Sequence, residues 1–153
     1  MREATMREAP VTALRHPPPW CGEYVGIPFA ERGRTREGCD CWGLVRLVLA
    51  ERWRVRVPSC DLIYRDTEDV EAIATTFATA AARGWRRVSG PYWREGDVAL
   101  FRVAGRPVHV GLIVGWPWML HVERGIDAAC DRIDGLRWAR RLDSVWRHPE
   151  LIP

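Results

Sequence analysis

The C-terminal half of the chain carries the pattern that most restricts the fold, a series of short apolar runs separated by turn residues. From Asp97 onward the apolar residues follow the period of β-strands, and turn residues stand at 104–106 and around 115–117. The three clear runs and two weaker ones are Val98 to Val103, Val108 to Val114, Trp118 to Val122, Ile126 to Ile133 and Trp138 to Trp146. Short turns join antiparallel neighbours, so the three clear runs predict an antiparallel meander, and the two weaker runs are plausible further strands.

Two helices are predicted before these strands. Asp40 is a typical N-cap, and the run from Cys41 to near Trp53 is apolar around most of its circumference, so we expect this helix to be central in the fold. A second helix is predicted from Thr67 to Gly84, with apolar residues on one face only. Helices followed by strands predict an α+β domain in which the central helix packs on an antiparallel sheet.

The length of the chain predicts a single domain. A chain of 153 residues with 47% apolar residues can build one hydrophobic core and leaves little room for a second. Residues 1–19 lack periodicity and end in three prolines. We therefore expect a flexible N-terminal arm over residues 1–19 and one domain over residues 20–153.

Charge and hydropathy argue against several classes of partner. The net charge is +3 and the basic residues are scattered among acidic ones, which predicts no nucleic-acid surface. No run of about 18 apolar residues is present, and the first ten residues lack the apolar centre of a signal peptide, so we expect no membrane insertion and a protein that starts out in the cytosol. Five irregularly spaced cysteines argue against a disulfide framework in such a chain.

Cys41 is the candidate nucleophile because it stands at the predicted start of the central helix. Unpaired backbone N–H groups and the helix dipole at that position favour a thiolate and are expected to lower the pKa of the thiol. A cysteine nucleophile also needs an imidazole within hydrogen-bond reach. His109 and His121, on two neighbouring predicted strands, are the candidates.

The spacing of the two histidines predicts that they lie together. Both are six positions from residue 115, so a hairpin centred there would place them directly opposite each other. Alternation puts Val108, Val110, Leu112 and Val114 on the core face and both imidazoles on the other, and we expect the imidazoles side by side beneath the helix start. One can accept the thiol proton while the other fixes its tautomer. The chain contains no Asn, which excludes the papain-type orienting residue.

These residues also carry a resemblance to a known family. The stretches YVGIPF at 24–29 and GRTREGCDCWGLV at 33–45 resemble the nucleophile region of the NlpC/P60 peptidases. The stretches REGDVALF at 94–101 and HVGLIVG at 109–115 resemble the strand pair that carries the base of that family. The resemblance covers about Trp20 to Arg124 and continues more faintly to residues 147–150.

The resemblance implies a papain-like α+β fold and hydrolysis of peptide bonds in peptidoglycan stem peptides, without a metal or other cofactor. It assigns Cys41 as nucleophile, His109 as base and His121 as the residue that orients the base. The form of residues 39–44 and the His-Pro-Glu ending look most similar to peptidases of phage tails and gene transfer agents. That similarity implies tail-tip or hub proteins as partners and the virion tail as the location.

Two positions depart from the pattern of the family. Phe29 stands where the family often has a Tyr whose hydroxyl assists the oxyanion, so oxyanion stabilisation is expected from the backbone N–H of Cys41, with Tyr24 as a candidate contributor. Trp42 replaces the common Ser after the nucleophile. Together with Trp116 and Trp118 it is also a candidate for contacting substrate, because indole rings stack on apolar faces.

Other interpretations of the same residues remain open. Cys39, Cys41, His109 and His121 could form a zinc site, although C-x-C is tighter than the usual knuckle. The domain could be a catalytically weak or inactive structural component of a tail tip, which Phe29 and Trp42 make conceivable. An acyl-transfer enzyme would use the same thiol and differs only in whether an amine replaces water.

Overall fold

The computed structural model describes residues 11–60 and 83–152, and in these the elements follow the predicted order of helix and strands. The elements are the 3-10 helix η1 (Pro19–Glu23), β1 (Arg34–Thr35), β2 (Gly38–Cys39), α1 (Cys41–Trp53), β3 (Arg86–Arg87), β4 (Val98–Val103), β5 (Arg106–Gly115), β6 (Trp118–Glu123), β7 (Ile126–Arg132), η2 (Ala139–Arg141), β8 (Leu142–Arg147) and η3 (Pro149–Leu151). The predicted helix from Thr67 to Gly84 lies almost wholly outside the described residues.

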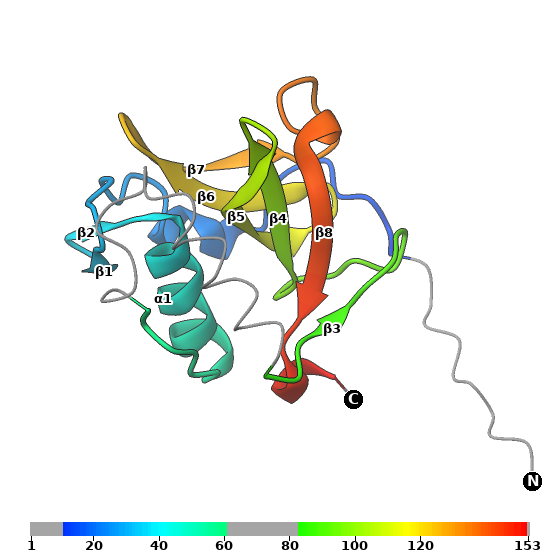
Figure 1. Ribbon diagram of the computed structural model, residues 1–153, viewed down its shortest axis with the longest axis horizontal. Coiled ribbons are helices and arrows are strands. Elements are labelled where there is room, and N and C mark those ends of the chain that lie inside the picture. Colours follow the sequence, from blue (N-terminus) through cyan, green and yellow to red (C-terminus); the bar gives the residue numbers. More distant parts are fainter. Residues whose placement is uncertain (1–10, 61–82, 153) are drawn as a thin grey trace, which may run out of the picture.

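Strands β3 to β8 form one curved six-stranded sheet with α1 packed against one face, while β1 and β2 pair with each other in a separate two-stranded sheet (Figure 1). All pairs in the sheet are antiparallel, in the order β3-β8-β4-β5-β6-β7. The meander from β4 to β6 was predicted, with β7 and β8 expected only as weaker further strands, whereas β3 and the place of β8 between β3 and β4 were not predicted. The predicted α+β architecture is confirmed.

Helix α1 begins and ends where the sequence pattern predicts, at Cys41 and Trp53. Its start is capped by Asp40, and the chain leaves it through Arg54 in the left-handed conformation (φ 56°). The helix is buried on several sides rather than along one stripe, which explains its apolar surface. No described helix is both long and apolar enough to cross a membrane.

Two apolar clusters cover the two faces of the sheet. The larger one joins the helix to the sheet, and it includes Leu44, Val48, Val110, Leu112 and Leu120. The smaller one lies on the opposite face and includes Ala99, Phe101, Ile113, Met119, Ile133, Trp138 and Val145. Alternation along β5 therefore separates the two cores as the pattern predicts.

The hairpin between β5 and β6 is centred one residue later than we expected. Leu112 pairs with Leu120 and Ile113 with Met119. Continued by one pair, this register places His121 opposite Gly111 rather than opposite His109. The turn residues are Trp116 and Pro117, so the strands extend to Gly115 and Trp118. A shift of two positions keeps each side chain on its predicted face, because side chains alternate with period two.

The segment before Trp20 contacts the same hairpin. The backbone N–H of Leu14 donates to Trp116 O at 2.8 Å, and the Trp118 indole donates to Leu14 O at 3.1 Å. Part of the predicted arm, from residue 11 onward, is thus placed against the β5–β6 turn. Residues 1–10 lie outside the described residues.

A buried ion pair joins the start of β4 to the end of β8. The guanidinium of Arg147 donates to both carboxylate oxygens of Asp97, at 2.7 and 2.9 Å, and also to Tyr92 O at 3.1 Å. Both charged side chains are almost fully buried. This bidentate pairing satisfies charges that would otherwise be costly to bury.

Replacing Gly43 by Ala should lower the melting temperature. A Cβ at this position would lie 1.9 Å from Gly33 O and 3.1 Å from Nη1 of Arg34. Overpacking of this kind costs about 1–3 kcal/mol, which in a domain of this size corresponds to roughly 3–10 °C. Gly22→Ala is the matched control, since a Cβ there meets nothing within 4 Å. Thermal unfolding measures both, and equal melting temperatures would contradict the expectation.

Candidate active site

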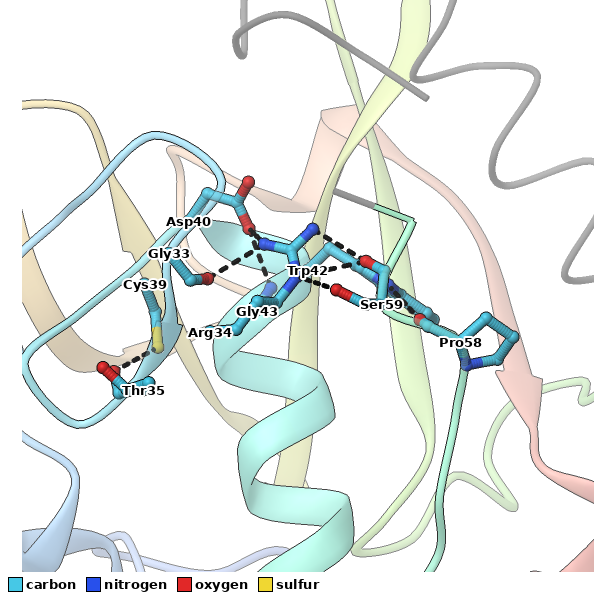
Figure 2. Close-up of polar contacts among 9 residues, drawn as sticks. All are labelled: Gly33, Arg34, Thr35, Cys39, Asp40, Trp42, Gly43, Pro58 and Ser59. Carbon is cyan, nitrogen blue, oxygen red and sulfur yellow. Dashed lines mark hydrogen bonds and ion pairs between the residues drawn. The ribbon is translucent and has the colours of Figure 1, made fainter. Parts of the chain in front are cut away.

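The start of α1 is held by a network centred on Asp40 and Arg34 (Figure 2). One carboxylate oxygen of Asp40 accepts from the backbone N–H of Gly43 at 2.8 Å and from Nη1 of Arg34 at 2.8 Å. Arg34 also donates to Gly33 O at 2.9 Å and, through Nη2, to Ser59 O at 2.8 Å. The guanidinium thus ties the loop before the helix to the segment after it, and Cys41 is fixed between them.

The thiol of Cys41 is neutral at ordinary pH, contrary to the expectation from its helix position. Burial and the negative charge of Asp40 raise its pKa to about 12, although hydrogen bonds from the backbones of Val110 and Trp42 and the positive charge of Arg34 oppose that rise. The physical reason lies in the cap itself. Asp40 offsets the positive end of the helix dipole that would otherwise favour a thiolate.

His109 and His121 lie together, as the sequence pattern predicts. His109 Nε2 and His121 Nδ1 are 3.1 Å apart, and the two rings meet edge to face. The other nitrogen of His121, Nε2, lies 2.8 Å from Oδ2 of Asp131 on β7. A chain of hydrogen bonds therefore runs through three neighbouring strands, from β5 through β6 to β7.

The protonation states in this hydrogen-bond chain follow from Asp131, the acidic residue at its end. Burial opposes ionisation of Asp131, but hydrogen bonds from His121 and Trp138 hold the pKa of its carboxyl below the ordinary value. Burial lowers the pKa of His121, against the effect of Asp131, and burial together with the charge of His121 lowers the pKa of His109 to about 3. Both imidazoles are thus neutral, and each carries one proton.

Only one arrangement of the two protons satisfies every contact. Asp131 can only accept, so Nε2 of His121 carries the proton and Nδ1 of His121 accepts. His109 must then donate from Nε2, which leaves the lone pair on its Nδ1. Asp131 thereby sets His109 in the tautomer of a general base, as the acid of a catalytic triad does.

Trp138 covers one side of this hydrogen-bond chain. Its ring stacks on His109, with centroids 5.1 Å apart and an interplanar angle of 17°, and its indole N–H donates to Oδ2 of Asp131 at 3.2 Å. The indole itself is almost fully buried. It shields His109 from water, which keeps that imidazole neutral.

Sequence reasoning missed both Asp131 and Trp138. No spacing motif marks either residue. The one available signal was the predicted strand from Ile126 to Ile133, because pairing it next to the strand of His121 brings Asp131 within reach.

The structure does not join the thiol to an imidazole by a hydrogen bond within residues 11–60 and 83–152. Instead, the Cys41 sulfur accepts from the backbone N–H of Val110, the residue that follows His109. The imidazoles lie on the sheet face of Trp138 and Phe101, whereas α1 packs on the other face. The imidazole rings therefore do not lie beneath the helix start as expected. Only the peptide unit between His109 and Val110 contacts the thiol there.

The residues expected to contact substrate are mostly engaged elsewhere. Trp42 is buried and donates to Pro58 O at 3.0 Å, while Trp116 packs on Trp93 and Trp118 donates to Leu14 O. Burial and Glu51 raise the pKa of Tyr24 to about 12. Since Glu51 is ten residues along α1 from Cys41, about 15 Å by the rise of a helix, the Tyr24 hydroxyl is not positioned for the oxyanion.

Phe29 offers no hydroxyl in its place. Its backbone bridges to Cys39, and the Arg124 guanidinium lies 5.7 Å from the centre of its ring. The backbone N–H of Cys41 remains the candidate oxyanion donor.

No group of three or more His, Cys, Asp or Glu side chains in the described parts of the chain is arranged to hold a metal ion. Of the four residues in the zinc interpretation, Cys39 donates to Thr35 O at 3.0 Å, and the two histidines bond to each other. A cavity of about 190 Å³ elsewhere is lined by residues outside the predicted site, namely Arg86, Arg87, Val88, Ser89, Tyr92 and Arg147.

Comparison with known proteins agrees with this architecture. The model of the NlpC/P60 family matches residues 26–147. The murein DD-endopeptidase MepS/murein LD-carboxypeptidase of Escherichia coli strain K12 is 22% identical over 125 residues, which cover 82% of this chain. The match spans only 57% of the length of that curated relative.

Solved structures share the fold at low sequence identity. The NlpC/p60 domain of the peptidoglycan hydrolase SagA superposes with a TM-score of 0.58 at 16% identity, over 84% of this chain and 92% of that one. An NlpC/P60 family protein from Bacillus cereus ATCC 10987 gives 0.61 at 16% identity, over 83% and 37%. NlpC2 from Trichomonas vaginalis gives 0.57 at 15% identity, over 84% and 43%.

Alkylation of Cys41 by iodoacetamide should accelerate with pH without a plateau near neutrality. A thiol whose pKa is raised holds little thiolate at pH 7, and that fraction grows about tenfold per pH unit until the pKa is reached. The rate is measured by mass spectrometry of the peptide that contains Cys41, with Cys41→Ala as the blank. A rate that is already constant from pH 6 to 8 would show a thiolate paired with an imidazolium and would contradict the expectation.

Proposed function

We propose that this chain, which belongs to the NlpC/P60 family, is a cysteine peptidase that hydrolyses peptide bonds in the stem peptides of peptidoglycan. Cys41 is the nucleophile, His109 the general base and His121 the residue that orients it. One observation carries the proposal, the hydrogen-bond chain from Asp131 through His121 to His109. This hydrogen-bond chain leaves a lone pair on Nδ1 of His109. The thiol of Cys41 contacts the backbone N–H of Val110, the next residue along the chain.

The names of similar proteins support the substrate class. The relative from Escherichia coli is named as a murein endopeptidase and carboxypeptidase, and SagA is described as a peptidoglycan hydrolase. Both names refer to the peptides of the bacterial cell wall or to the wall itself. The match covers only 57% of the length of the relative from Escherichia coli, and we propose that this chain acts on the same class of substrate.

The site favours proton transfer during attack rather than a preformed ion pair. The thiol and the imidazole are both neutral at rest, so the thiol proton moves to Nδ1 of His109 as sulfur bonds to the substrate carbonyl. This transfer requires the thiol and Nδ1 of His109 to come within hydrogen-bond reach of each other. His109 then returns the proton to the leaving amine, and water hydrolyses the thioester. The backbone N–H of Cys41 can stabilise the oxyanion.

Digestion of purified peptidoglycan tests the activity. The parent protein should release fragments with new stem-peptide termini, identified by mass spectrometry, and Cys41→Ala should lower their yield by at least about 1,000-fold, because the nucleophile is lost. Equal, empty digests from both proteins would overturn the proposal. They would favour the structural role in a tail tip, which the neutral thiol and Phe29 also fit.

A second variant separates orientation of the base from folding. In Asp131→Asn an amide can donate to His121, which no longer fixes the tautomer of His109, so kcat should fall by about 10- to 100-fold with KM nearly unchanged. Asp134→Asn is the matched control, since that exposed carboxylate bonds Arg132 on the surface and should leave kcat unchanged. Equal kcat values for the two variants, with both folded, would remove Asp131 from the mechanism.

We also propose that the peptidase acts as part of a phage-type tail during penetration of the cell wall. The support is the similarity of residues 39–44 and of the His-Pro-Glu ending to peptidases of phage tails and gene transfer agents. Purified particles from the source cells should contain the chain, detected by mass spectrometry, in constant ratio to tail proteins. Recovery of the chain only outside the particle fraction would contradict this location.

A further inference from the structure

Two thiols from distant parts of the chain meet outside the site described above. Cys21 on η1 and Cys130 on β7 are joined by a side-chain hydrogen bond. Cys21 is buried in the larger apolar cluster, whereas Cys130 is only partly buried and packs against it. All five cysteines are reduced in this structure.

The backbone holds these two elements together. The N–H of Gly26 donates to Ala128 O at 2.8 Å, and the N–H of Ala128 donates to Ile27 O at 2.8 Å. Residues 26 and 27 thus pair with β7 on the edge that β6 leaves open. The backbone therefore places the segment that follows η1 beside β7, which brings Cys21 and Cys130 close together.

We propose that Cys21 and Cys130 form a reversible disulfide by exchange with a small-molecule disulfide such as oxidised glutathione. The Cys130 thiolate attacks one sulfur of the glutathione disulfide and releases one glutathione thiolate. The Cys21 thiolate then attacks the Cys130 sulfur and releases the second. Two protein thiols are oxidised, one small disulfide is reduced to two thiols, and the two protons pass to the released glutathione.

The surroundings of the two thiols assign their order of reaction. The hydrogen bond from Cys21, against the effect of burial, lowers the pKa of Cys130, which is also the more accessible of the two. The pKa of Cys21 is raised, first by that same bond and then by burial. Once Cys130 is capped by glutathione, its charge no longer opposes ionisation of Cys21, so Cys21 can act as the resolving thiol.

The bond would restrain the strand that carries Asp131. Cys130 precedes Asp131 directly, and β7 lies at one end of the strand order of the sheet. A cross-link from this strand to η1 encloses more than a hundred residues, and long enclosed loops give large stabilisation in the chain-entropy model. The proposal rests on the thiol contact alone and does not require the proposed peptidase activity.

Oxidation of the intact protein tests the proposal. The parent chain is incubated with oxidised glutathione, digested without reduction and mapped by mass spectrometry. We expect a peptide pair linked through Cys21 and Cys130, and a rise in melting temperature of about 5–10 °C that dithiothreitol reverses. Cys130→Ser should lose both signals, whereas Cys60→Ser, which replaces another partly buried cysteine, should retain both.

Other products would overturn the proposal. Glutathione adducts on Cys130 without a linked peptide would show that Cys21 does not resolve them. A link between other cysteines, or an equal rise in melting temperature in Cys130→Ser, would assign the effect to another pair. Because the readouts are peptide mass and melting temperature, their failure leaves the proposed peptidase untouched, and loss of peptidase activity leaves the disulfide untouched.

Discussion

The position of the candidate nucleophile depends on one carboxylate, that of Asp40. It caps α1 through Gly43 and accepts from Arg34, which in turn binds the carbonyl groups of Gly33 and Ser59. Gly43 has no room for a side chain, because the Gly33 carbonyl occupies that space. The same carboxylate that places Cys41 also raises the pKa of its thiol. The cap that fixes the position of the Cys41 thiol therefore also lowers the fraction of reactive thiolate.

The base side of the site has a different electrical character. His109 and His121 are neutral and buried, and the carboxylate of Asp131 is the charged group at the far end of their hydrogen-bond chain, with Glu123 and Arg137 close by. The charge of Asp131 acts through two hydrogen bonds rather than directly. Its effect on His109 is to select a tautomer, without creating a positive imidazole that the apolar surroundings could not stabilise.

The sequence predicted what periodicity and capping determine. The bounds of α1, the strands β4 to β7 and the faces of His109 and His121 all follow from local patterns. The predicted register of the β5–β6 hairpin was wrong by two positions, because the observed pairing is centred on residue 116 rather than on residue 115 of the predicted turn at 115–117. The role of Asp131 depends on the pairing of strands distant in sequence, and only the predicted strand from Ile126 to Ile133 pointed to it. The raised pKa of Cys41 depends first on burial, which a single sequence does not give, and then on the neighbouring Asp40, which was identified only as a helix cap.

The place of β8 in the sheet has a consequence for how the chain acquires its structure. Strand β4 pairs with β5 through a short turn, but its other edge pairs with β8, some forty residues later. During synthesis that edge of β4 stays unpaired until β8 has been made. The ion pair of Asp97 likewise cannot form before Arg147 has been added to the chain. Such distant pairing raises the contact order and slows folding, so β8 joins the sheet later than the locally connected strands β4 and β5.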